Sequence, residues 1–243
     1  MELEGRVALV TGASKGLGRE IARAYAGRGA RLVLAARGEE ALRAVEAELA
    51  ATTEVLAVAA DVSEEAERIV EGAIRRFGRV DVLVNNASEL GPSPMPVLEA
   101  YRWQDLERVL RVNVLAPLHL TQLVLPGMRA RREGVVINVT SDAGVEAYAG
   151  WGGYGASKAA LEHLSRTLAA ELEGTGIRVY AVDPGDMNTE MHRRAEPGVD
   201  LSGLPGPEVA APRFVSLVEQ ETAMSGRFVA AAPAVATAPA AWL

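Results

Sequence analysis

Apolar and polar positions are arranged along the chain in blocks that predict a mixed α/β protein. Seven short runs are largely apolar and rich in Val, Leu and Ala, as buried parallel strands are. The longer segments between them show apolar positions at helical spacing. The expected strands are residues 6–11, 31–36, 55–60, 82–87, 135–139, 177–182 and 226–230. The expected helices are residues 19–28, 39–51, 64–77, 98–132, 153–174 and 208–220.

This alternation predicts a doubly wound parallel sheet of about seven strands in a single domain that spans residues 1–243. Pro117 and Pro126 fall inside the longest helical pattern and are expected to kink or interrupt it. Ligands bind outside the carboxyl ends of the strands in such sheets. The residues expected at those ends are Gly12, Arg37, Asp61, Asn86, Ser141 and Pro184.

Composition narrows the possible partners. The 243 residues carry a net charge of −7, which argues against a nucleic-acid surface. There is no cysteine, hence no disulfide or thiolate chemistry. The start lacks a basic signal-peptide region, and the apolar residues 229–243 are mostly alanine and broken by prolines, so we expect a cytoplasmic protein without a membrane span. No metal-ligand cluster is indicated, because the histidines are scattered at positions 119, 163 and 192.

A glycine turn joins the first expected strand to the first expected helix. Gly12, Gly16 and Gly18 are spaced as G-x-x-x-G-x-G, whereas a plain strand-to-helix turn would use one glycine. Glycines let the backbone approach a ligand closely, and the helix N-terminus offers free N–H groups to phosphate. The turn therefore indicates nucleotide binding.

The end of the second expected strand bears on the choice of nucleotide. An acidic residue there would bind the ribose 2′-OH of NAD, but Arg37 occupies the position and suits a 2′-phosphate. Lys15 in the glycine turn could add a second cation. Glu39 and Glu40 weaken this interpretation unless they point to solvent, and both cations could instead be solvated surface charges.

Tyr154 and Lys158 are four residues apart, which places both side chains on one face of a helix. A nearby cation favours the phenolate and lowers the pKa of a tyrosine, which can then exchange a proton with a substrate oxygen. Only Lys15 and Lys158 are lysine among 25 Lys and Arg residues, so a lysine at position 158 is unlike an ordinary surface cation of this chain. Alone, the pair could still be an accident of a surface helix.

Taken together, these motifs resemble the short-chain dehydrogenase/reductase family over residues 5–185, and more weakly over the last helix and strand. The family's T-G-x-x-x-G-x-G begins at Thr11, and its N-N-A-G begins at Asn85, with Ser88 replacing the final glycine. Its catalytic Asn, Ser, Tyr and Lys fall on Asn113, Ser141, Tyr154 and Lys158. The resemblance implies a seven-stranded Rossmann sheet, and a homodimer or homotetramer formed through the helices that bear Asn113 and Tyr154.

The resemblance also implies roles. Tyr154 would exchange a proton with the carbonyl oxygen, and Ser141 would hydrogen-bond that oxygen. Lys158 would hold the nicotinamide ribose and lower the Tyr154 pKa, and Asn113 would keep a helix kink and a water. Asp61 and Val62 would meet the adenine, Asn86 and Ala87 the adenosine side, and Thr189 the carboxamide. The expected cofactor-binding set is Gly12, Ser14, Lys15, Gly16, Leu17, Gly18, Arg37, Asp61, Val62, Asn86, Ala87, Tyr154, Lys158, Pro184, Gly185 and Thr189.

The leading hypothesis is an NADP(H)-dependent oxidoreductase of carbonyls and secondary alcohols, such as a 3-oxoacyl or other ketone reductase. The alternatives are a sugar or polyol dehydrogenase that uses NAD(H), and a non-catalytic nucleotide-binding sensor. Residues 186–212 are expected to form a substrate lid that is mobile until ligand binds. Residues 228–233 depart from the family's usual V-D-G-G, which puts the C-terminal contacts in doubt. The side chains that suggest a partly apolar pocket, although each could be core or interface, are Tyr148, Trp151, Met187 and Met191.

Overall fold

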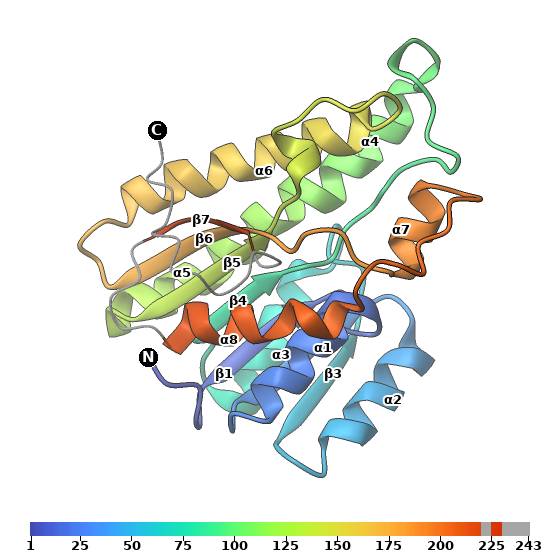
Figure 1. Cartoon of the computed structure of the whole chain (residues 1–243). Coiled ribbons are helices and arrows are strands. Elements are labelled where there is room, and N and C mark those ends of the chain that lie inside the picture. Colours follow the sequence, from blue (N-terminus) through green and yellow to red (C-terminus); the bar gives the residue numbers. More distant parts are fainter. Residues whose placement is uncertain (220–224, 230–243) are drawn as a thin grey trace.

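The computed structural model describes residues 1–219 and 225–229, which contain one seven-stranded sheet (Figure 1). The strands are β1 (Val7–Thr11), β2 (Arg31–Ala36), β3 (Val55–Ala59), β4 (Val82–Asn85), β5 (Gly134–Val139), β6 (Ile177–Asp183) and β7 (Gly226–Val229). They lie in the order β3-β2-β1-β4-β5-β6-β7, and each neighbouring pair is parallel. The predicted doubly wound parallel sheet is confirmed.

Helices cover both faces of the sheet. The α-helices are α1 (Gly16–Ala26), α2 (Glu39–Leu49), α3 (Ala66–Phe77), α4 (Trp103–Leu110), α5 (Ala116–Arg131), α6 (Gly152–Glu171), α7 (Glu190–Ala195) and α8 (Ala211–Glu219). Short 3-10 segments are η1 (Leu98–Ala100), η3 (Asp142–Gly144) and η4 (Pro207–Val209), and η2 (Arg111–Leu115) is a π-helical turn. Helices α1, α2 and α8 pack on one face, and α3, α5 and α6 pack on the other (Figure 1).

Burial on both faces explains why the strands are apolar without alternation. In β1, Ala8 and Val10 join the core under α1 and α8, while Val7 and Leu9 join the core under α3 and α5. All four side chains are fully buried. A strand covered on both sides gains from an apolar residue at every position, which is the pattern that runs through this sequence.

The strand order of the sheet switches from one side of β1 to the other. From β1 the chain goes outward through β2 to β3, and then returns to place β4 on the other side of β1. The loops that leave β1 and β4 therefore diverge and open a crevice at the carboxyl edge of the sheet. The glycine turn follows β1 and Asn86 follows β4, so both lie at this crevice.

The long helix expected over residues 98–132 is interrupted. The chain forms η1, then α4, then the π-turn η2, then α5. In η2 the N–H of Ala116 donates to the carbonyl of Arg111, five residues back, and Pro117 has no N–H to give to the carbonyl of Asn113. The interruption thus lies one turn before Pro117, whereas α5 continues through Pro126.

The segment Trp103–Arg131 is, within the described part of the chain, the one helical stretch long and apolar enough to cross a membrane by length and composition alone. Within its most apolar window 44% of the residues are buried. Val112, Leu120 and Val124 belong to the core between the sheet and α3. Part of the apolar character of this segment is therefore used in packing on the sheet.

Other boundaries differ modestly from the predicted ones. Helix α1 begins at Gly16, inside the glycine turn, rather than at residue 19. Helix α7 lies in the segment expected to be an irregular lid, and it was not predicted. The last residues of the final predicted helix and strand, 220 and 230, and most of the unusual 228–233 stretch lie outside the described residues, as does the alanine-rich tail after Val229.

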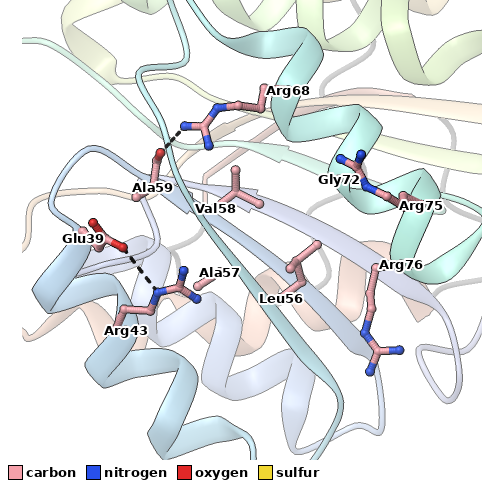
Figure 2. A pocket seen from close by; sticks show the side chains of 10 residues that line it. All are labelled: Glu39, Arg43, Leu56, Ala57, Val58, Ala59, Arg68, Gly72, Arg75 and Arg76. Carbon is pink, nitrogen blue, oxygen red and sulfur yellow. Dashed lines mark hydrogen bonds and ion pairs between the residues drawn. The ribbon is translucent and has the colours of Figure 1, made fainter.

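The outer strand β3 is shielded by side chains at its free edge. The carboxylate of Glu46 accepts the N–H of Ala57 at 2.8 Å. The guanidinium of Arg68 donates to the carbonyl of Ala59 (Figure 2). Both groups point away from β2 and would otherwise offer a pairing edge to another chain. An open hollow of about 630 Å³ lies over this edge and is ringed by arginines.

Candidate active site

A cleft of about 690 Å³ opens along the carboxyl edge of the sheet and brings most of the predicted site residues together. Among the predicted residues, Gly18 and Asn113 do not line it. The predicted residues that do are Gly12, Ser14, Lys15, Gly16, Leu17, Arg37, Asp61, Val62, Asn86, Ala87, Ser141, Tyr154, Lys158, Pro184, Gly185 and Thr189.

The glycine turn at one end of the cleft is tightly packed. A Cβ on Gly12 would lie 2.8 Å from Nδ2 of Asn86, and a Cβ on Gly18 would strike the carbonyl of Gly12. Gly12 and Gly16 also have positive φ angles of 66° and 56°, which favour glycine. Gly18 therefore shapes the turn from behind, while Gly12 and Gly16 face the cleft.

Asn86 and Thr11 tie the turn to the end of β4. Nδ2 of Asn86 donates to the carbonyl of Thr11 at 2.8 Å. Oγ1 of Thr11 accepts the N–H groups of Asn86 and Ala87, each at 3.0 Å, and donates to the carbonyl of Val84 at 3.2 Å. The Asn86 side chain thus holds the glycine turn in place and keeps this part of the cleft lining fixed.

A pair of glycines lets the loop after β5 approach α6. A Cβ on Gly155 would lie 2.5 Å from the carbonyl of Ala143, and a Cβ on Gly144 would lie 2.9 Å from the backbone nitrogen of Ala159. This close approach brings Ser141, which precedes η3, beside Tyr154 on α6. The Ser141 hydroxyl donates to the carboxylate of Asp142 at 2.9 Å and accepts the N–H of Ala143 at 3.2 Å.

Lys158 is almost fully buried beneath Tyr154. Its Nζ donates to the carbonyl of Val139, at the end of β5, at 2.8 Å. The same Nζ lies 5.4 Å from the centroid of the Tyr154 ring. Burial lowers the pKa of Lys158 to about 7.

The expectation that Lys158 lowers the pKa of Tyr154 is wrong for this structure. Desolvation dominates and raises the pKa of Tyr154 above its ordinary value. The hydroxyls of Ser88 and Ser141 act in the opposite direction, while the charges of Asp183 and Asp142 add to the rise. The physical reason is that burial also disfavours the charged form of Lys158, whose hydrogen bond goes to Val139.

Asn113 lies in η2, and its amide joins three segments. Its Oδ1 accepts the N–H of Glu89 at 2.7 Å and the hydroxyl of Ser88 at 3.2 Å. Its Nδ2 donates to the carbonyl of Glu89 and to the hydroxyl of Ser157 on α6, each at 2.9 Å. The helix irregularity expected at Asn113 is present, and the side chain acts as a buried tie between the β4 loop and α6.

Both cations predicted for a 2′-phosphate have carboxylate partners. Nζ of Lys15 lies 2.7 Å from Oε2 of Glu190 on α7. Nη1 of Arg37 lies 3.8 Å from Oε2 of Glu89. Both side chains remain largely exposed at the mouth of the cleft. Glu39 and Glu40 are exposed, as the NADP(H) interpretation required.

Aromatic and apolar side chains form the other end of the cleft. The Trp151 ring packs edge-on against Tyr154, with centroids 5.9 Å apart, and against His192, with centroids 6.4 Å apart. Met187 and Met191 line the same region. Thr189 caps α7, since its hydroxyl accepts the N–H of His192 at 3.2 Å. Tyr148 stands outside this wall, where its hydroxyl donates to Asp142 at 2.9 Å.

Several lining residues escaped the sequence analysis, among them Ser88, Glu89 and Asp142. Ser88 had been noted only as a departure from a glycine. Glu89 and Asp142 follow recognised motif positions directly, and a charged residue next to a motif at the carboxyl edge was the signal that could have found them. Among the residues described, no group of three His, Cys, Asp or Glu side chains is arranged to hold a metal ion.

The cleft fits a nicotinamide dinucleotide. At one end, the glycine turn is so crowded that it has no room for side chains at Gly12 and Gly18. This turn lies beside the N-terminus of α1, and helix N-termini bind phosphate well. The reactive phenol and Lys158 stand at the other end.

Comparison with known proteins gives the family. A family model of short chain dehydrogenases matches residues 6–200. The chain belongs to this family. It is an oxidoreductase of the kind that interconverts CH–OH and C=O groups.

Relatives and solved structures agree over most of the chain. A 3-oxoacyl-[acyl-carrier-protein] reductase of Escherichia coli (strain K12) is 34% identical over 193 residues, which cover 79% of this chain and 78% of that protein. A metagenomic short-chain oxidoreductase in complex with NADP is 34% identical, with a TM-score of 0.80 over 93% of this chain and 96% of that one. A 3-ketoacyl-(acyl-carrier-protein) reductase from Brucella melitensis complexed with NADH is 30% identical, with a TM-score of 0.85 over 93% and 96%.

Proposed function

We propose that this short-chain dehydrogenase is an NADP(H)-preferring ketone reductase. The observation that carries the proposal is the convergence of Ser141, Tyr154 and Lys158 at one end of a cleft whose other end is a glycine turn. A nucleotide-binding sensor has no need of a half-buried phenol beside two serine hydroxyls.

A nicotinamide bound in this cleft would supply the hydride for a carbonyl carbon, or would accept one from the alcohol. Tyr154 gives its proton to the carbonyl oxygen, and desolvation keeps the phenol protonated until that step. The Ser141 hydroxyl turns from Asp142 to donate to the same oxygen and positions it. Lys158, held at the end of β5, would bind the nicotinamide ribose, and Asn113 ties α6 to the β4 loop.

The preference for NADP(H) is supported by charge at the adenosine end. Arg37 replaces the acid that would bind a ribose 2′-OH, and Lys15 stands in the neighbouring turn. Similar structures carry NADP or NADH, so the support for NADP(H) comes from the local charges of this chain. Asp61 and Val62 are proposed to meet the adenine, and Thr189 the carboxamide.

The substrate end favours a ketone with apolar or aromatic substituents. Trp151 and the two methionines offer an apolar wall, and His192 adds a polar edge. A 3-oxoacyl thioester is the leading candidate class because of the Escherichia coli relative. Residues 186–212, with α7 at their centre, are proposed to cover this end as a lid.

A cytoplasmic homodimer or homotetramer is proposed, formed through the α4–α5 and α6 helices. Trp103 on α4 and Leu115 in η2 are large apolar side chains that stay more than half exposed in the single chain. Sedimentation at micromolar concentration tests this, and a monomer would contradict it.

The proposed activity is tested by a panel of carbonyl compounds with NADPH and NADH side by side. The panel holds a 3-oxoacyl thioester, an aromatic ketone, an aliphatic ketone and a ketose. Turnover of a ketone with NADPH at a higher kcat/KM than with NADH supports the proposal. Turnover confined to the ketose with NADH would favour a polyol dehydrogenase, and binding of nucleotide without any turnover would favour a sensor.

A further inference from the structure

Glu89 lies between two arginines at the adenosine end of the cleft. Its Oε2 is 3.2 Å from Nη2 of Arg108 on α4 and 3.8 Å from Nη1 of Arg37 at the end of β2. Its other oxygen accepts the N–H of Gly91 at 3.3 Å. The Glu89 side chain is 8% exposed, whereas those of Arg37 and Arg108 are 60% and 66% exposed. A buried carboxylate is therefore hydrogen-bonded to the Arg108 guanidinium and lies within ion-pair distance of the Arg37 guanidinium.

Asp61 belongs to the same group of charges. Burial acts to raise its pKa, but the hydroxyl and N–H of Ser63 and the charges of Arg37 and Arg108 outweigh this effect and lower it. The two carboxylates, Glu89 and Asp61, thus stand against the two guanidinium groups. With all four groups ionised, the cluster has no net charge.

We propose that Glu89 is a cofactor-specificity residue that competes with the 2′-phosphate of NADP(H) for Arg37. Arg108 reduces this competition because it shares the carboxylate of Glu89. This inference rests on the proposed NADP(H) site. A phosphate monoester carries a charge of about −1.5 to −2 at neutral pH. To reach Arg37, the phosphate must approach a cation that is already close to the Glu89 carboxylate. The negative charges of the phosphate and the carboxylate repel each other. An NAD(H) ribose carries no such charge and meets no such competition.

A purely structural Glu89 would behave differently. As a tie between the β4 loop and α4 it would affect all adenosine nucleotides alike, because the loop also forms the wall of the adenosine site. The competing role predicts instead that removing the charge of Glu89 strengthens binding of one nucleotide only. The ratio of two affinities separates these roles.

The test uses adenosine 2′,5′-bisphosphate and adenosine 5′-monophosphate, which differ only in the 2′-phosphate. Both are titrated calorimetrically into the full chain and into Glu89→Gln, which keeps the size of the side chain and an acceptor for Gly91. We expect the bisphosphate to bind about tenfold more tightly to the variant, or about 1.4 kcal/mol. We expect the monophosphate affinity to stay within about twofold, a change of less than about 0.5 kcal/mol.

Glu39→Gln is the matched control. It removes the same charge two residues after Arg37, but its carboxylate is 3.8 Å from Arg43 and lines the hollow over β3 rather than the cleft (Figure 2). The affinity ratio should not change in this variant. An equal rise in both variants would reduce the effect to net charge and overturn the inference, as would an unchanged or lower ratio in Glu89→Gln.

Arg108→Gln gives a second measurement if Glu89→Gln fails to fold. Without Arg108, Glu89 is left with Arg37 as its one arginine partner, so the bisphosphate should weaken relative to the monophosphate. An unchanged ratio would overturn the inference. None of these measurements needs turnover. If the parent chain binds both nucleotides and the ratio of their affinities is the same in the variants, this inference alone is wrong. If the parent binds neither nucleotide, the proposed function is wrong as well.

Discussion

Nζ of Lys158 lies 5.4 Å from the centroid of the Tyr154 ring, yet it donates its hydrogen bond to the carbonyl of Val139. The two groups therefore share a face of α6 without a direct charge contact between ammonium and hydroxyl. Burial pushes the lysine toward its neutral form and the tyrosine toward its protonated form. A protonated phenol is the form that can give a proton to a carbonyl oxygen.

Tyr154→Phe should remove nearly all turnover and leave the cofactor site intact. The substitution deletes the hydroxyl that gives or takes the proton, and keeps the ring that packs against Trp151. General acid–base catalysis contributes ~10²–10⁴ in rate, so a loss of that size is expected in kcat. The measurements are ketone turnover and nucleotide affinity in the same preparation. Turnover within a factor of two of the parent would show that another group handles the proton.

Lys158 should make the stability of the protein depend on pH above neutrality. Its pKa is about 7 in the folded chain, against about 10.4 in an unfolded one. Between these values the unfolded chain binds more protons, so the free energy of unfolding should rise as pH increases from 7 to 9. Two pH units at about 1.4 kcal/mol each bound the gain at roughly 2–3 kcal/mol.

The check is urea unfolding of the parent and of Lys158→Met at pH 7 and pH 9. The variant cannot titrate at this position, so the difference in unfolding free energy between the two proteins should change with pH. A difference that stays constant would mean that Lys158 titrates alike in both states.

Sequence reasoning was accurate where a residue's surroundings follow from its own neighbours in the chain. The strands were found because burial on both faces makes them continuously apolar, as in β1 and β5. The helix break expected at Asn113 is present, whereas α5 continues through Pro126, because a break depends on which carbonyl loses its donor rather than on where a proline stands. Helix α7 was missed because its six residues carry too short a pattern, although Thr189 is an ordinary N-cap residue.

The candidate site divides in the same manner. Gly12 and Ser141 were expected at the carboxyl edge from the strand ends, and the family resemblance brought Tyr154 and Lys158 to the same cleft. The pKa of Tyr154 could not be predicted, because it depends on how much water the fold removes and on hydroxyls from a different loop. The partner of Arg37 was equally hidden, since Glu89 is 52 residues away in sequence, from position 37 to position 89.

Asp81→Ala should destabilise the fold without touching the cleft. Asp81 is fully buried at the start of β4, where it accepts the N–H of Val7 at 3.0 Å and a bond from Arg79 at 2.8 Å, with Arg131 at 3.6 Å. Its removal leaves the N–H and two cations without their shared carboxylate. Breaking a buried pair in this way costs roughly 3–5 kcal/mol.

Urea unfolding of Asp81→Ala measures this loss against Asp105→Ala. Asp105 pairs with Arg102 at 3.9 Å at a more exposed position and should matter by less than about 1 kcal/mol. Equal losses in the two variants would contradict the role assigned to the buried carboxylate.

Arg37→Asp should reverse or abolish the preference for NADPH. The change removes the cation proposed to meet the 2′-phosphate and supplies an acid that can bind the ribose 2′-OH. A charge-assisted contact is worth roughly 1.5–3 kcal/mol, so the ratio of kcat/KM with NADPH to that with NADH should fall at least about tenfold. Arg43→Asp makes the same charge change on the hollow over β3 and should leave the ratio unchanged. A parent that prefers NADH would reduce Arg37 to a surface charge.

Ser88→Ala should shift the pH profile of alcohol oxidation to higher pH. Ser88 stands where the family's motif has glycine, and its hydroxyl favours the ionised form of Tyr154. The same hydroxyl donates to Oδ1 of Asn113 at 3.2 Å, and it turns from Asn113 toward the phenol when the phenolate forms. Loss of the hydroxyl raises the pKa of Tyr154 further, and oxidation needs the phenolate to take the proton of the alcohol. A hydrogen bond is worth roughly 0.5–1.5 kcal/mol, which predicts a two- to tenfold slower oxidation at neutral pH.

Ketone reduction starts from the protonated phenol and should be less affected. Ser88→Thr keeps a hydroxyl and should restore the profile. An unshifted profile in Ser88→Ala, with equal losses in both directions, would make Ser88 only a part of the loop's packing.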